Sequence, residues 1–256
     1  MQFLSTPTDT IAVIDGVLPS AGEWALIARD RVLVNVLSMP GRAESLDDLV
    51  PFGGYISRLS VNSATCTDLT AVERLPHLKW LLVGGVVTQH PNPEKLTSLE
   101  YFAGDPTLFP GIVSLPTISR LKIRWRDSVM DEVSASTSEL TLTEASRLAH
   151  LGGIERLRSL SSLTIHGSRH ISLGGLGSLT SLRSLTLHSV KRIEDTSAVL
   201  DAPQLSRFTL EDCREIDQPE CLLAFTGEVV VIGRNPFTAE FKRAAGSAWT
   251  FPRGTP

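Results

Sequence analysis

Residues 179–190, LTSLRSLTLHSV, decide the fold of this chain. Their leucines are Leu179, Leu182, Leu185 and Leu187, so they follow one another at intervals of three, three and two residues. An amphipathic helix needs apolar residues at intervals of three and four, and a half-buried strand needs them at every second position. The stretch therefore predicts a turn that leads into a short strand, with its leucines on one inner side.

The same spacing recurs along most of the chain. Six clear copies end at Val83, Gly104, Ile123, Ile165, Leu187 and Leu210, and three weaker copies end at Val61, Leu142 and Ile232. The steps between these final positions are 22, 21, 19, 19, 23, 22, 23 and 22 residues. A constant period of this length over many copies is typical of a solenoid, because one coil cannot bury its apolar face alone. We expect the strands of neighbouring coils to form a parallel sheet with a spacing of about 4.8 Å.

These residues resemble the leucine-rich repeat family over residues 55–233. The first half of each repeat carries the resemblance, and the second half departs from it. Where the family usually has an Asn that bonds the turn backbone, this chain has Ala64, Val86, Ser168, Val190 and Cys213. LTLHSVKRIED and FTLEDCREID are closer to cysteine-type or irregular bacterial variants. The resemblance implies an α/β solenoid, a right-handed coil with a parallel sheet on the concave face and short helices or turns on the convex face.

The ends of the chain differ from its middle and predict caps. We expect residues 1–54 to form an N-terminal cap and a first aberrant coil, residues 55–233 a solenoid of about nine coils, and residues 234–256 a C-terminal capping helix and tail. Strands are predicted at residues 11–14 and 31–37, and Ser20 and Glu23 have the spacing of a capping box. Val36 precedes Val61 by 25 residues. Residues 235–246 predict a short helix with Pro236 near its first turn, and the final PRGTP predicts a loose tail.

The segments between the predicted strands are short. Residues 68–75 and 194–200 each open with an acidic residue of the kind that caps a helix, so one helical turn is expected in each. Residues 141–151 predict a longer helix, and residues 125–137 predict an irregular loop.

Composition and charge exclude several classes of protein. The net charge of −4 gives no sign of a nucleic-acid partner, which favours a strongly basic protein. The three cysteines, Cys66, Cys213 and Cys221, lack metal-ligand spacing and predict reduced thiols. No signal peptide or apolar run long enough to span a membrane is evident, so we expect a cytoplasmic location and no membrane partner.

Alternation along each strand predicts which side chains face outward on the concave side. The first outward column is Arg58, Trp80, Tyr101, Arg120, Glu139, Ser162, Ser184, Arg207 and Val229. The middle column is Ser60, Leu82, Ala103, Lys122, Thr141, Thr164, Thr186, Thr209 and Val231. The third column is Asn62, Gly84, Asp105, Arg124, Thr143, His166, His188, Glu211 and Gly233.

Two regions of these columns are candidates for binding. Aromatic and arginine side chains dominate protein-binding hot spots, which favours the group Trp80, Tyr101, Arg120, Lys122 and Arg124. The flanking candidates are Arg58, His166, His188, Arg207 and Glu211. The alternative interpretation is that three basic residues on one strand only keep it solvated, while Trp80 packs under a loop. For the column of threonines, a simple preference of β-branched residues for strands is the better explanation.

Chemistry is the weaker hypothesis. His166, His188 and Glu211 occupy equivalent positions in successive coils and could approach a common metal ion, but an open sheet lacks the surrounding groups that a metal site needs. The sequence contains no GxSxG, HExxH, CxxC or Walker A motif. Cys213 fills a turn position and reads as a core residue. We therefore predict no catalytic residue, no metal and no cofactor.

The function predicted from the sequence is non-enzymatic binding of another protein through the concave face. Three alternatives stay open: an immunity or antitoxin-like protein that neutralises a toxin enzyme, a metal-dependent hydrolase that uses His166, His188 and Glu211, and a structural subunit that uses its convex side or its ends. The sequence identifies neither the partner nor the oligomeric state.

Overall fold

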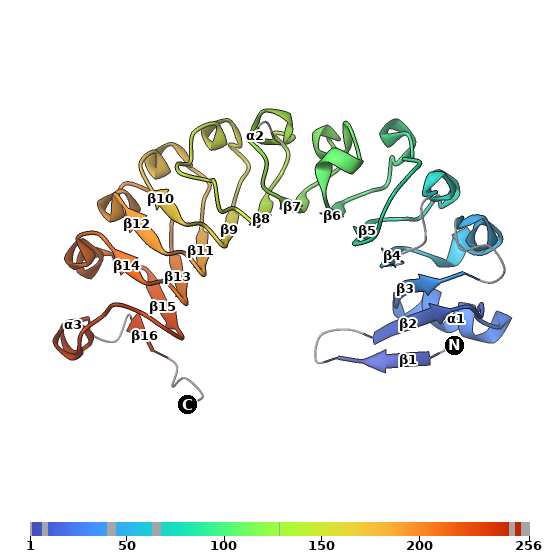
Figure 1. Ribbon diagram of the computed structural model, residues 1–256, viewed down its shortest axis with the longest axis horizontal. Coiled ribbons are helices and arrows are strands. Elements are labelled where there is room, and N and C mark those ends of the chain that lie inside the picture. The colour runs from blue at the N-terminus through green and yellow to red at the C-terminus, as the bar shows by residue number, and fades with distance from the viewer. Residues whose placement is uncertain are drawn as a thin grey trace. The chain divides into compact units, whose positions relative to one another are not determined.

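The computed structural model describes residues 2–6, 10–39, 45–62, 68–127, 129–245 and 249–251. The chain forms two compact units, Met1–Ile118 and Ser119–Pro256. In each unit, equivalent strands of successive coils pair side by side, and short helices lie in the segments that connect the coils (Figure 1). Cys66, Ala64 and the PRGTP tail lie outside the described residues.

The strands of the first unit are consecutive in the chain and in the sheet. They are β1 (Gln2–Ser5), β2 (Thr10–Asp15), β3 (Leu33–Ser38), β4 (Arg58–Val61), β5 (Trp80–Val83) and β6 (Tyr101–Gly104). β1 pairs with β2 in antiparallel fashion, and the other pairs are parallel. Val36 lies opposite Val61. β3 therefore lies beside the strand of the first predicted repeat, with paired valines 25 residues apart in the sequence.

The N-terminal helix forms where its capping residues predict it. α1 (Ala21–Asp30) begins after Ser20, whose Oγ accepts a hydrogen bond from the backbone N–H of Glu23, while the Glu23 carboxylate accepts one from the N–H of Ser20. This reciprocal pair satisfies two N–H groups that the first helical turn leaves without partners. Trp24 and Ile27 are buried on the inner side of the helix. β1 was not predicted, because QFLS has no alternation that marks a strand.

The connections of the first unit are 3-10 helices, at Asp47–Tyr55, Thr70–Arg74, Pro93–Lys95, Pro106–Leu108 and Ile112–Ser114. The helical turn predicted at residues 68–75 is present, and Asp68 accepts hydrogen bonds from both the backbone N–H and the hydroxyl of Thr70. Val86, which stands where the family has its Asn, is 61% exposed and so lies outside the core.

The second unit holds two sheets. The larger has the order β7 (Arg120–Arg124), β8 (Glu139–Thr143), β9 (Ser162–His166), β11 (Ser184–His188), β13 (Arg207–Glu211), β15 (Glu228–Ile232) and β16 (Trp249–Thr250). The smaller has the order β10 (His170–Ser172), β12 (Arg192–Glu194) and β14 (Glu215–Ile216). All the pairs given for these strands are parallel. The smaller sheet was not predicted, because its strands have only two or three residues each.

Equivalent side chains stack from coil to coil in the core. Leu163, Leu185 and Phe208 are paired in register and are fully buried. Leu140 joins this row through its pairing with Leu163. The leucines of the opening stretch, Leu179, Leu182, Leu185 and Leu187, are all buried as well. The prediction that each coil turns its apolar side chains toward a common core is therefore confirmed in this unit.

Two local predictions in the second unit are wrong. Residues 141–151 contain no helix; they hold the end of β8 and a turn, and Ala145, Leu148 and Leu151 are buried turn positions spaced by three residues. That spacing matches a helix as well as it matches a coil, which explains the error. The segment expected to be an irregular loop contains the short helix α2 (Val129–Glu132). α3 (Ala239–Ala244) is capped by Thr238, so Pro236 precedes its first turn.

The register of β15 is shifted by one residue from the prediction. Glu228 pairs with Arg207, and Val229 pairs with the buried Phe208. Val229 and Val231 are therefore inside the core, while Ile232 is 37% exposed. The predicted outward residues Val229, Val231 and Gly233 are replaced by Glu228, Val230 and Ile232. EVVVI has no alternation of polar and apolar residues, so its sequence does not fix which face is buried.

Short 3-10 helices connect the strands of the second unit, at Ile154–Arg156, Leu176–Ser178, Thr196–Val199 and Pro219–Ala224. The helical turn predicted in residues 194–200 is thus present. Among the described residues, no helix is long and apolar enough to cross a membrane. The division of the chain at residues 54 and 233 stays a prediction.

Candidate functional site

The first unit presents a stacked group at the beginning of three neighbouring strands. Arg58, Trp80 and Tyr101 are the first residues of β4, β5 and β6, and they lie in register. The Arg58 guanidinium carbon lies 4.5 Å from the centroid of the Trp80 ring. The rings of Trp80 and Tyr101 are 4.4 Å apart with an angle of 31° between their planes. We call these three residues the aromatic cluster.

Each side chain of the aromatic cluster is half-buried, so a part of each stays available to solvent. A guanidinium over an indole face is attracted by the ring quadrupole, and stacked rings have few rotamers left to lose on binding. The cluster is therefore a preorganised surface that combines apolar area with positive charge.

Beside the cluster, the outward face of this sheet is partly closed to solvent. Ser60 is 3% exposed and Ala103 is 6% exposed, although the alternation of the strands places both on the outward side. Asn62 donates hydrogen bonds to the Ser60 hydroxyl at 2.9 Å and to Asn35 Oδ1 at 3.1 Å. Short side chains between taller neighbours explain this burial. The middle column of the first unit supports the surface and contributes little area to it.

The predicted basic strand lies in the second unit, on β7. Arg120 is half-buried, and Lys122 and Arg124 are exposed. Arg124 forms an ion pair with Glu144, in which both its Nε and an Nη group donate to the same carboxylate oxygen. Within the group predicted as one region, Trp80 and Tyr101 belong to the first unit, and the three basic residues belong to the second.

The histidine column forms as predicted at the ends of β9 and β11. His166 and His188 lie in register, with their Nδ1 atoms 2.9 Å apart, and Glu211 is the next residue in the row. One Glu211 oxygen lies 3.8 Å from His188 Nε2. Burial lowers the pKa of His166 below 6.5, and the charges of His188 and Lys122 lower it further, whereas Glu211 acts in the opposite direction. A bond between two Nδ1 atoms needs one donor and one acceptor, so the pair favours a state with at least one neutral ring.

The arrangement of the side chains in this column does not match that of a metal site. In the part of the chain that the structure describes, no group of three or more His, Cys, Asp or Glu side chains is arranged to hold a metal ion. The hydrolase hypothesis requires such a group, so we do not carry it further.

Arg207 has a partner that the sequence did not predict. Its Nε donates to a Glu228 oxygen at 3.0 Å across the β13–β15 pair. The predicted register put Val229 beside Arg207, so the prediction missed this ion pair. Between the arginine and the histidine column, Thr164, Thr186 and Thr209 lie in one row and are half-buried.

The cysteines that the structure describes are free thiols, Cys213 and Cys221. Cys213 is buried, and burial raises the pKa of its thiol to about 11. Its Sγ donates to the Leu187 carbonyl at 3.4 Å. A thiol with this pKa is protonated at neutral pH and is a poor nucleophile, which agrees with the prediction of a core residue.

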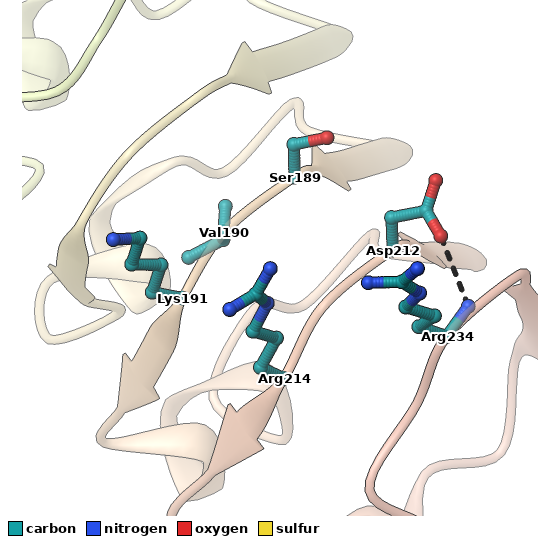
Figure 2. Close-up of a pocket in the computed structure, with 6 residues that line it drawn as sticks. All are labelled: Ser189, Val190, Lys191, Asp212, Arg214 and Arg234. Atoms are coloured by element: carbon teal, nitrogen blue, oxygen red, sulfur yellow. Dashed lines mark hydrogen bonds between the residues drawn. The ribbon is translucent and has the colours of Figure 1, made fainter.

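A basic cleft lies beyond the C-terminal ends of β11, β13 and β15. It has a volume of about 480 Å³ and is lined by Ser189, Val190, Lys191, Asp212, Arg214 and Arg234. Figure 2 shows the Arg234 side chain extending toward Arg214, with the Asp212 carboxylate bonded to the backbone N–H of Arg234 at 3.0 Å. Ser189 and Asp212 have φ angles of 54° and 52°, and this left-handed backbone bends the chain sharply after each strand.

The sequence analysis missed this cleft, although the sequence holds a signal for it. Lys191 and Arg214 each follow the last buried leucine of their strand, Leu187 and Leu210, by four residues. The predicted outward columns end with the strands. They therefore do not include Lys191 and Arg214, which lie in the turns that follow.

Comparison with solved structures identifies the fold. An internalin (inlF) of Listeria monocytogenes matches 84% of this chain at 18% identity with a TM-score of 0.55. A chain in the structure of the Toll–Spatzle complex of Drosophila matches 88% of this chain at 14% identity with a TM-score of 0.57. The protein has the leucine-rich repeat fold.

The leucine-rich repeat fold expected from the spacing of the leucines is thereby confirmed. This chain spans 64% of the internalin chain and 34% of the chain from the Drosophila complex. No protein-family model matches the sequence, and a sequence search of curated proteins finds no match. At these low identities the comparison establishes the fold, and the function has to be argued from the surface.

Proposed function

We propose that this leucine-rich repeat protein binds another protein through the outward face of its parallel sheet, without chemical turnover. The observation that carries the proposal is the aromatic cluster of Arg58, Trp80 and Tyr101 on three neighbouring strands. Tryptophan, tyrosine and arginine are the residue types that most often dominate the binding energy of protein interfaces.

The rigidity of the cluster supports binding more than its area does. β4, β5 and β6 fix the three Cα positions, and the ring contacts fix the side chains. A partner that docks here loses little additional side-chain entropy from this surface, so more of the contact energy becomes affinity. One of the solved structures with this fold is a protein complex, which is consistent with such a role.

The other predicted binding residues have different parts in this proposal. Lys122 and Arg120 offer positive charge on β7, and His166, His188 and Glu211 offer a polar row. Arg124 and Arg207 are held in ion pairs with Glu144 and Glu228, so a partner has to compete with these carboxylates. We expect both arginines to contribute less than the aromatic cluster, because a surface ion pair must be opened before they bind.

The test is capture of a partner by matched variants. Trp80→Ala removes the central ring of the cluster, and Tyr55→Ala removes a 44% exposed aromatic ring that lies outside the strands of the same unit. Immobilised wild-type protein and both variants are exposed to lysate of the source cells, and the captured proteins are identified by mass spectrometry. The leading partner is then produced and its affinity measured with each variant.

We expect Trp80→Ala to weaken the interaction by at least tenfold, because truncation of a hot-spot residue costs about 2 kcal/mol or more. Tyr55→Ala should leave the affinity within twofold of wild type. Circular dichroism of each variant checks that the fold is intact. Equal affinities for Trp80→Ala and wild type would reject the outward face as the binding surface.

A further inference from the structure

The strongest unassigned feature is a row of basic side chains in the second unit, at the turns that follow its strands. Arg169 precedes β10, Lys191 precedes β12 and Arg214 precedes β14, each by one residue. The pairing of His170 with Arg192 and of Arg192 with Glu215 sets these three cations side by side in successive coils.

The row extends by one residue at each end. The bridge between His150 and Ser172 aligns Arg147 with Arg169 in the preceding coil. Arg234 lines the basic cleft together with Lys191 and Arg214. We call Arg147, Arg169, Lys191, Arg214 and Arg234 the basic row. Their sequence positions are separated by 22, 22, 23 and 20 residues, close to the period of the coils.

The cations of the basic row have no carboxylate of their own. All five side chains are exposed, and none forms an ion pair or a side-chain hydrogen bond with any residue in the described ranges. Asp212, the acidic residue that lines the cleft, directs its Oδ1 to the backbone N–H of Arg234. Neighbouring like charges on adjacent strands are destabilising, so a ligand that brings negative charge to the basic row would remove this repulsion.

The next position along the same strands is a useful contrast. There His170, Arg192 and Glu215 form a row of mixed charge, and Glu194 binds both Arg192 at 2.8 Å and His170 Nε2 at 2.7 Å. The cations of this row are paired with Glu194, whereas those of the basic row have no such pair among the described residues. The difference points to a ligand that brings the missing negative charge to the basic row.

We propose that the basic row is a second interaction surface, which binds an acidic protein helix that carries one carboxylate per turn along one face. Its cations follow one another at about 4.8 Å, the spacing of paired strands. Carboxylates one turn apart on a helix are about 5.4 Å apart along the axis, so the mismatch over three steps is about 2 Å. Side chains on one face of an extended strand are about 6.7 Å apart, so the mismatch reaches about 6 Å.

The charge of the chain also favours an acidic helix over a nucleic acid as the ligand of the basic row. The net charge of the chain is −4, and a polyanion of high charge density is repelled by the remainder of such a protein. A helix with a single acidic face presents its charge to the row alone. The basic cleft of about 480 Å³ between Lys191, Arg214 and Arg234 admits a carboxylate side chain between two guanidinium groups.

The test uses a designed probe with the full chain. The probe is a four-turn helical peptide with one Glu per turn on one face, labelled with a fluorophore, and its binding is followed by fluorescence anisotropy. A peptide of the same composition with its glutamates distributed around the helix is the first control. A DNA duplex with the same label is the second.

The variants separate the basic row from general charge effects. Arg169→Gln and Arg214→Gln each remove one cation of the row, and Arg192→Gln removes a cation of the neighbouring row that is already paired with Glu194. We expect each of the first two variants to weaken the acidic-face peptide about two- to fivefold, and the double variant more than tenfold. Arg192→Gln tests whether loss of any nearby cation has the same effect, and we expect this variant to bind the acidic-face peptide like wild type. The distributed peptide tests whether the glutamates must lie on one face, and we expect wild-type protein to bind it much more weakly.

Several results would overturn the proposal: equal losses for Arg214→Gln and Arg192→Gln, equal binding of the two peptides, or tighter binding of the duplex than of either peptide. Trp80→Ala distinguishes this surface from the outward face of the sheet. It should leave peptide binding unchanged even if it abolishes capture of the other partner, so the two proposals can fail separately. Thermal unfolding of each variant checks that the exposed substitutions preserve the fold.

Discussion

At the residue scale, small polar side chains bond the turn backbone at the position where the leucine-rich repeat family usually has an asparagine. Ser168 is 1% exposed, and its hydroxyl lies 2.9 Å from the Leu148 carbonyl and 2.8 Å from the His170 carbonyl. It also accepts from the His170 backbone N–H at 3.2 Å. Cys213 makes weaker contacts of the same kind with the carbonyls of Leu187 and Glu211. Buried backbone groups need partners, so these side chains take over the turn position.

Val190 shows that a polar side chain is not required at this turn position in every coil. It fills the same turn position, is fully buried and has no polar side chain. The backbone N–H of Arg214 donates to the Val190 carbonyl instead, at 3.2 Å. The sequence predicted which residues stand at this position, but the choice between side-chain and backbone partners depends on the neighbouring coil.

His166 makes the stability of the protein sensitive to pH. The pKa of His166 is 6.5 in its ordinary, unfolded state and lies below that value in the folded protein. At a pH between the two pKa values, the unfolded chain therefore binds more protons than the folded one. The free energy of unfolding should therefore fall as the pH falls below about 6.5, and the contribution should be fully present above that pH. Urea unfolding at a series of pH values from about 5 to about 7.5 measures this change, because that range includes the ordinary histidine pKa of about 6.5.

His166→Gln should flatten this part of the pH profile, and His77→Gln, which changes an exposed histidine outside the column, should leave it unchanged. The carboxylates with lowered pKa, such as Glu73 and Glu194, titrate below 4.5 and so act outside this range. An identical profile for wild type and His166→Gln would contradict the assignment.

At the element scale, β15 shows where alternation stops being informative. β9, β11 and β13 have the sequences SLTIH, SLTLH and RFTLE, in which polar and apolar residues alternate. EVVVI has four apolar residues in succession, so either face could be buried. The neighbouring strand decides between them, because Glu228 reaches Arg207 and Val229 covers Phe208 in the observed register.

Charged substitutions along β15 test this register. Val231→Lys places a charge in the core and should destabilise the protein by more than about 3 kcal/mol, because a buried unpaired charge costs several kcal/mol. Ile232→Lys changes a side chain that is 37% exposed and should cost less than about 1 kcal/mol. Chemical denaturation measures both, and the opposite order of the two variants would restore the register predicted from the sequence.

The predictions for the candidate site also depend on whether a residue lies on a strand with clear alternation. The alternation of buried and half-buried positions predicted for β9 and β11 is observed, because polar and apolar residues alternate clearly in these two strands. The ion pairs of Arg124 and Arg207 were not predicted, because Glu144 lies in a turn and Glu228 depends on the register of β15. The basic row lies in turns as well, where no alternation indicates which side chains face solvent.

At the scale of the whole molecule, each coil is stabilised by the coils beside it. In the second unit β9, β11 and β13 have strands on both sides, whereas β16 has a neighbour on one side. In the first unit β1 is paired on one side and its four residues are exposed. Stability in such arrays is approximately a sum of coil and nearest-neighbour contributions, so it is expected to vary along each unit.

Amide hydrogen exchange should show this variation. We expect amides of β9, β11 and β13 to exchange at least about tenfold more slowly than those of β1 and β16, because terminal elements open with a smaller free energy than central ones. Mass spectrometry of peptic fragments after timed labelling measures the rates. Equal protection of β11 and β16 would mean that the second unit opens only as a whole.

The sequence alone determined the repeat, the positions of the strands that recur with it and the buried leucines, because a periodic pattern of apolar residues has one efficient way to be buried, by stacking equivalent positions. Tertiary structure alone decided the register of β15, the ion pairs of Arg124 and Arg207, the cation–ring contact of Arg58 and the alignment of the basic row. Each of these depends on the distance between residues about 20 positions apart or more, and that distance is set by how one coil pairs with the next.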